Sequence, residues 1–199
     1  MCAQQPLPDL RTEAIDGGSV LHVRNPSSQP LTAFLIELVN YPGSYYALWQ
    51  DDVAAPIPPG GQKRIQIVNM TVGAAPEYVK LRAALYADGT SAGVPEQVKQ
   101  FVERRRFVLA TTRQLIERIG KARSSGSTAA SLGEGLRAWA DSIPQPTRSN
   151  RATSETVNNN AARGLIEDTA RAVESSSLDA VLAGLRKSEQ VLAASKPAL

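Results

Sequence analysis

Short runs of alternating apolar and polar residues dominate the first half of the chain. The clearest run covers residues 31–40, where Phe34, Ile36 and Leu38 alternate with Leu35 and Glu37. A period of two is the pattern of a β-strand that buries one face. About six such runs, separated by turn residues, lie before residue 94. The pattern predicts an antiparallel β-sandwich over residues 11–93, after a proline-rich lead-in at residues 1–10.

The second half of the chain has a different pattern. After Gly93 the apolar residues recur every three or four positions, which is the period of an α-helix, and Pro95 suits a first helical turn. Ser131 and Glu134 have the spacing of a capping box. The predicted fold class is therefore segregated α+β, with an all-helical domain over residues 94–199. We expect one long helix and three shorter ones, at about residues 95–122, 131–143, 155–174 and 178–194.

Charge is divided unevenly between the two halves. Residues 1–93 hold six Lys or Arg and eight Asp or Glu, and residues 94–199 hold sixteen and eleven, so their net charges are −2 and +5. Proteins held on nucleic acid present a clustered basic face, whereas the basic residues here are interleaved with Glu. We therefore expect no nucleic-acid partner. We also expect no transmembrane segment, because no apolar run approaches the roughly 20 residues that span a bilayer.

The inventory of catalytic residue types is small. The chain has one histidine, His22, and one cysteine, Cys2, which excludes a zinc site built from Cys and His alone. His22 lies inside a predicted strand, where a satisfied or surface histidine is the expected reading, and no nucleophile motif accompanies it. The sequence leans against an enzyme. The rival hypothesis is a hydrolase that uses carboxylates.

Three acidic residues at predicted strand ends are the candidates for that chemistry. Asp51 and Asp52 close one strand, and Asp88 opens an Asp-Gly turn. If the strand ends converge, these oxygens could bind calcium, or act as the hydrolase's carboxylates. The simpler interpretation of Asp88 is a turn in which Asp caps and Gly takes a positive φ. No other cofactor is expected.

Aromatic residues gather in one short segment. Four of the ten aromatic residues lie within nine positions, at Tyr41, Tyr45, Tyr46 and Trp49. An exposed Tyr and Trp platform would bind another protein or a glycan. Alternatively Trp49 is a core residue of the sandwich. We expect at least one of the tyrosines to be exposed.

The residues around Cys2 indicate export. Met1-Cys2-Ala3 has the small residues of a processed secretory start, and Cys2 alternatively resembles the lipid-carrying first residue of a bacterial lipoprotein. A cytoplasmic start with an incidental cysteine stays open. The expected location is the periplasm or the medium, with or without a lipid anchor.

Two turn motifs carry a resemblance to a known class of domain. Residues 23–32 read Val-Arg-Asn-Pro-Ser-Ser-Gln-Pro-Leu-Thr, and residues 57–61 read Ile-Pro-Pro-Gly-Gly. With the Ala-Asp-Gly-Thr-Ser-Ala-Gly run at residues 87–93, they resemble the turns of bacterial immunoglobulin-like modules joined to a helical tail in exported proteins. The resemblance covers residues 11–93 and implies an immunoglobulin-like sandwich with no attached activity. The helical half resembles no such class.

These observations combine into one functional hypothesis. We expect a non-enzymatic, exported bacterial protein whose sandwich is a binding or assembly module. The alternatives are the carboxylate hydrolase and a structural domain that calcium stabilises. The sequence leaves the partner and the oligomeric state open.

Overall fold

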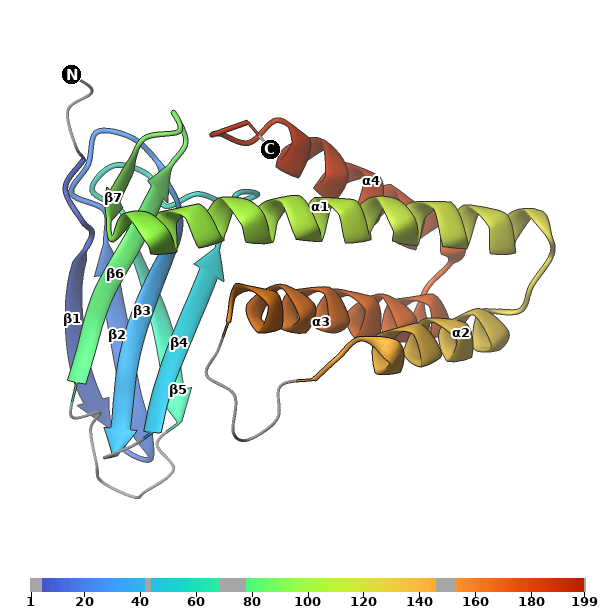
Figure 1. Cartoon of the computed structure of the whole chain (residues 1–199), viewed down its shortest axis with the longest axis horizontal. Coiled ribbons are helices and arrows are strands. Elements are labelled where there is room, and N and C mark those ends of the chain that lie inside the picture. Colours follow the sequence, from blue (N-terminus) through green and yellow to red (C-terminus); the bar gives the residue numbers. More distant parts are fainter. Residues whose placement is uncertain (1–4, 42–43, 69–77, 146–152, 199) are drawn as a thin grey trace. The chain divides into compact units, whose positions relative to one another are not determined.

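The protein folds into two compact units, which a computed structural model describes over residues 5–41, 44–68, 78–145 and 153–198. The sandwich unit contains the strands and extends to Phe101, with Ser195–Ala198 added to it. The helical unit comprises Val102–Ala194. Figure 1 shows the strands followed along the chain by the helices, which confirms the segregated α+β class. The division between the units falls inside a helix, later than the boundary predicted at residue 93.

Two antiparallel sheets form the sandwich unit (Figure 1). The three-stranded sheet has the order β1-β2-β5, and the four-stranded sheet has the order β4-β3-β6-β7. Strands that are neighbours in sequence and strands far apart in sequence both pair within each sheet. The strand bounds are β1 Asp9–Ile15, β2 Gly18–Arg24, β3 Leu31–Tyr41, β4 Ser44–Asp51, β5 Gln62–Val68, β6 Tyr78–Tyr86 and β7 Ser91–Gly93.

Alternating residues of both sheets meet in one apolar core. Phe34 and Ile36 of β3 are fully buried there beside Leu21 and Val23 of β2. Burial of such side chains contributes about 1.5–3 kcal/mol each, relative to leaving them in water. The other buried members are Leu31, Leu38, Ile57, Leu81, Ala84, Tyr86 and Ala92.

A buried asparagine joins the two turn motifs of this unit. The Asn25 side-chain amide donates to the carbonyl oxygens of Gln29 and Ile57, at 2.8 and 3.0 Å. The side-chain oxygen Oδ1 of Asn25 accepts from the Ser27 backbone N–H at 3.0 Å. The backbone N–H of Asn25 donates to the Gly61 carbonyl oxygen at 2.9 Å. Residues 25–29 and 57–61 are thereby bonded to each other across the end of the sandwich. The motifs that carry the resemblance are thus one structural feature.

Four helices follow the strands, as predicted: α1 Pro95–Ser124, α2 Ala129–Ser142, α3 Ser154–Ser175 and α4 Leu178–Ala193. The N-cap of α2 is Thr128, whose side chain accepts from the Ser131 amide, so the predicted capping box at Ser131 is wrong. Two residues after the end of α1, Gly126 adopts a left-handed backbone conformation, with φ of 70°, which residues with a side chain rarely adopt. Ser127 N then donates back to Ala122 O at 3.0 Å.

The core of the helical unit uses smaller side chains. The largest fully buried side chains of this core are Leu115, Ile119, Leu136 and Ile166. Ion pairs lie over it, including Arg163 with Asp141 and Glu167, at 3.1 and 2.7 Å. The remaining buried core residues are Ala140, Ala170, Val173, Leu182 and Leu185. None of the helices, over the residues described, combines the length and the apolar character that crossing a bilayer requires.

Candidate functional site

The aromatic segment predicted as a binding platform lies mainly on β4. Tyr45 pairs with Val39 and Tyr41 with Ser44 at the β3–β4 end, and the side chains of Tyr41 and Tyr45 lie outside the described residues. Tyr46 is 42% exposed, which confirms the expectation of an exposed tyrosine. It is one of the few large hydrophobic side chains at the surface of this unit.

Trp49 lies on the face of β4 opposite to the sandwich core. Leu48, the residue before Trp49, packs against that core. Leu35 pairs with Trp49 across the strands, so it lies on the same face of the sheet as Trp49, and it is buried there. The Trp49 ring meets Phe101 edge-on, with 4.8 Å between centroids and 70° between planes. The interpretation of Trp49 as a core residue of the sandwich is therefore wrong. A ring held edge-to-face against Phe101 suits packing better than stacking on a sugar.

Strand β4 is the edge of the four-stranded sheet. The Asp52 amide donates to Thr32 O at 2.7 Å, in register with the β3–β4 ladder. Because hydrogen-bonded and non-bonded pairs alternate along an antiparallel ladder, the pairs Leu35–Trp49 and Glu37–Ala47 are of the non-bonded type. The backbone N–H and C=O groups of Ala47 and Trp49 therefore point away from β3, toward a position where another strand would pair.

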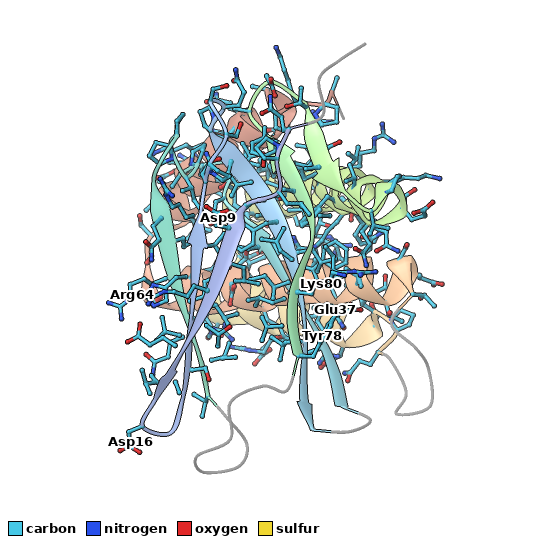
Figure 2. All side chains as sticks on the ribbon, turned by 90° about the vertical axis from the view of Figure 1, so that its left-hand side faces the viewer. Asp9, Asp16, Glu37, Arg64, Tyr78 and Lys80 are labelled. Atoms are coloured by element: carbon cyan, nitrogen blue, oxygen red, sulfur yellow. The ribbon has the colours of Figure 1, made fainter. Side chains whose placement is uncertain are left out.

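The other long edge strands carry charges along their length, whereas β4 carries one only at its last residue, Asp51. Residues 44–50 of β4 contain no charged side chain. By contrast, β1 displays Arg11 and Glu13, and β5 displays Lys63 and Arg64, with Arg64 projecting from the sheet in Figure 2. Charged side chains protect exposed edges against pairing with another chain. Over residues 44–50, β4 is thus the long edge without that protection.

A charged group occupies the outer face of the four-stranded sheet. Glu37 pairs with Lys80 across the strands, and the carboxylate of Glu37 lies 3.5 Å from Nε of Arg82. Tyr78 is 40% exposed and lies near Glu37 and Lys80 (Figure 2). This face of the sheet therefore combines charge and an aromatic ring on β3 and β6.

The three candidate carboxylates occupy separate local structures. Asp52 accepts two bonds from the Lys63 ammonium, at 2.5 and 2.7 Å, and one from Gln50 at 3.1 Å. Asp88 accepts from the Thr90 hydroxyl and amide, and these bonds lower the pKa of Asp88, the hydroxyl having the larger effect. Asp51 ends β4 and is half-buried. Within the described part of the chain, no three His, Cys, Asp or Glu side chains make a group that could hold a metal ion.

His22 joins all three strands of its sheet, which sequence reasoning did not find. Its Nε2 lies 2.6 Å from Glu13 Oε2 on β1, and its Nδ1 lies 2.6 Å from Gln62 Nε2 at the start of β5. Since the Gln62 amide donates, Nδ1 accepts and Nε2–H donates to Glu13. This bond lowers the pKa of Glu13. Both ring nitrogens are occupied, so the arrangement serves to tie strands and leaves no nitrogen to activate a nucleophile.

Cys2, the candidate for lipidation, lies outside the described residues. Comparison with known proteins adds no assignment, because no protein-family model, curated protein or solved structure matches the chain. The edge of β4 is therefore the feature of the molecule that best indicates a function.

Proposed function

We propose that the chain is a non-enzymatic binding module that adds an extended segment of a partner protein to the edge of β4. The observation that carries this proposal is the absence of charge along residues 44–50 of a long edge strand, in a unit whose other long edges carry charges. Outward N–H and C=O groups at Ala47 and Trp49 offer the hydrogen bonds, and exposed Tyr46 offers an apolar contact.

The binding energy in such a complex comes mainly from the backbone. Each main-chain bond between the strands would contribute about 0.5–1.5 kcal/mol net. Side chains at alternate positions of the partner would then contact Tyr46 on one face of the sheet and Ala47 on the other. A protein fits this geometry better than a glycan, because Trp49 is engaged with Phe101.

The sandwich is proposed to be immunoglobulin-like. In the constant-type immunoglobulin fold, strands one, two, five and four share one sheet, and strands three, six and seven share the other. Here β1, β2 and β5 form one sheet and β3, β6 and β7 the other, but the fourth strand, β4, lies beside β3 and not beside β5. Placement of an extra strand beside the third is a feature of the variable type. The strand order and the Asn25 turn support the proposal together.

Export to the periplasm or the medium of a bacterial cell is part of the same proposal. Its motivation is the composition around Cys2 and the resemblance of the turns to exported modules. Fractionation of source cells with an antibody to the helical unit tests it. Detection in the periplasmic, membrane or secreted fraction is the expected result, and confinement to the cytoplasm would contradict it.

Two matched lysine substitutions test edge binding. Ala47→Lys places a charge on the edge of β4, and Gln66→Lys places the same charge on the edge strand β5 of the other sheet; both positions are exposed. We expect protein captured from source-cell extract by the wild type and by Gln66→Lys to be lost with Ala47→Lys. Circular dichroism of both variants confirms that the fold is intact.

Equal capture by both variants would contradict the edge as the binding surface. Binding to a glycan array that survives Ala47→Lys would replace the protein partner by a carbohydrate. Turnover of a small substrate by the purified chain would overturn the non-enzymatic proposal altogether.

A further inference from the structure

A groove lies within the helical unit, between the C-terminal part of α1 and the first turns of α2. It has a volume of about 320 Å³ and is open to solvent on one side. This is the lower end of the range for small-molecule sites. Its lining residues are Arg118, Lys121, Ala122, Ser127, Ser131, Leu132, Gly135 and Leu136.

The lining divides into an apolar part and a basic part. Leu132, Leu136 and Ala122 supply carbon surface, and Leu136 also belongs to the core of the unit. Arg118 and Lys121 supply two positive charges, and no acidic residue lines the groove. Such a lining complements a small molecule with an anionic head and an apolar body.

The Arg118 guanidinium is available to bind the anionic head of such a molecule. The guanidinium carbon lies over the Trp139 ring, 4.3 Å from the centroid, which is a cation–π contact. Among the described residues, no hydrogen-bond acceptor or ion-pair partner engages this guanidinium. A stacked guanidinium keeps its N–H groups at the edge of the plane, where a carboxylate can accept two parallel bonds.

Lys121 differs from Arg118, because it already pairs with Glu117 at 2.5 Å. This bond lowers the pKa of Glu117. Both side chains are mostly exposed, so the pair is screened by solvent and contributes little. Lys121 can therefore turn toward an anion, while Arg118 supplies a charge that makes no direct ion pair among the described residues.

Gly135 keeps space open beside the groove. A side chain added there would have no atom within 4 Å of its Cβ. Glycine in a helix interior is destabilising by roughly 0.5–1 kcal/mol relative to alanine. The absence of a side chain in this lining position costs stability and leaves room for a ligand.

We propose that this groove binds a small amphiphilic carboxylate, with the carboxylate on Arg118 and the apolar body against Leu132 and Leu136. The site lies in the helical unit, and the proposal is independent of partner binding at β4.

Titration of the full-length, ¹⁵N-labelled chain with sodium octanoate tests the proposal. We expect saturable shifts at the Ser131 and Gly135 amides and at the Arg118 Nε–Hε resonance, with a Kd of about 1 mM for a ligand of this size. Acetate, which lacks the apolar body, and 1-octanol, which lacks the charge, should each bind at least about tenfold more weakly.

Three variants locate the site. Arg118→Gln should weaken octanoate binding about tenfold, while Arg113→Gln, on the same helix and bonded to Glu189, should leave it unchanged. Gly135→Leu fills the groove with a better helix former, so the fold is retained while binding is lost. Octanoate binding no tighter than acetate, or Arg118→Gln and Gly135→Leu titrating as the wild type, would overturn the proposal.

Discussion

The two units of the chain are stabilised in different ways. The sandwich unit buries Leu, Ile, Phe and Tyr side chains between two sheets, and hydrogen bonds of buried Asn25 join segments 32 residues apart. The helical unit has three alanines or valines among nine core residues, and it surrounds them with ion pairs such as Arg113–Glu189. Specific turns hold the first unit, whereas the second depends on a few large side chains in a thin core.

Each unit contains one of the two tryptophans, which allows the comparison to be measured. Trp49 belongs to the sandwich unit and Trp139 to the helical unit. In a Trp139→Phe background the fluorescence reports the sandwich unit, and in a Trp49→Phe background it reports the helical unit. The predictions below use these two backgrounds with urea unfolding.

The largest effect is expected for Asn25→Ala. The substitution leaves the Gln29 carbonyl and the Ser27 amide without this partner, and it removes one of two bonds to the buried Ile57 carbonyl, which still accepts from Leu31 N. We expect the free energy of unfolding of the sandwich unit to fall by about 4 kcal/mol, since each unsatisfied group costs about 1–3 kcal/mol. Urea unfolding followed by Trp49 measures it. A loss below about 1 kcal/mol would show that the turn does not hold the unit.

Leu136→Ala is the corresponding substitution in the helical unit. Leu136 is 1% exposed, and its loss leaves a cavity among small neighbours. We expect a loss of about 3 kcal/mol, measured through Trp139. Leu178→Ala, at a partly buried position beside the same core, is the control and should cost less. Equal losses would mean that the core is not centred on α2.

The pH dependence should differ between the units. The bond from His22 lowers the pKa of Glu13, so the stabilisation from this carboxylate is present above its ordinary pKa of 4.5 and is lost as the pH falls through the lowered value. Glu13→Gln should therefore flatten the acid side of the stability curve of the sandwich unit. The same variant followed through Trp139 should show no change. An unaltered acid slope through Trp49 would contradict the role of this bond.

The smallest effect is a gain of stability. Gly135→Ala places a Cβ in open space on α2, and we expect it to stabilise the helical unit by about 0.5–1 kcal/mol. Gly133→Ala is the matched control, because its Cβ would lie 2.5 Å from the Glu174 carboxylate, which must then move. Thermal unfolding of both variants measures the difference. A gain for Gly133→Ala as large as that for Gly135→Ala would be unexpected.

Local patterns in the sequence predicted the strands and helices, but not how the strands are arranged. Alternation along β3 and the helical period after Pro95 depend only on neighbouring residues, so they indicated the elements directly. The face of Trp49 was not predictable, because both Leu48 and Trp49 are apolar and either face of β4 fits a core. The edge position of β4 likewise depends on pairing between distant strands.

The same distinction applies to side chains. The prediction that Asp88 belongs to an Asp-Gly turn is confirmed. Its partner Thr90 lies only two residues along the chain, so the local sequence was enough to predict it. The bonds of His22 to Glu13 and Gln62 were missed, because the three residues meet only through the register of three strands. The start of α2 was misplaced because Thr128 and Ser131 are both good caps.

The edge of β4 is the central claim, and site-specific photo-crosslinking in source cells tests it most directly. A photoreactive residue placed at Ala47 should crosslink to one partner protein, and the same residue placed at Gln66, on the charged edge of the other sheet, should not. Crosslinking of the same protein with equal yield from both positions, or of nothing from Ala47, would contradict the account.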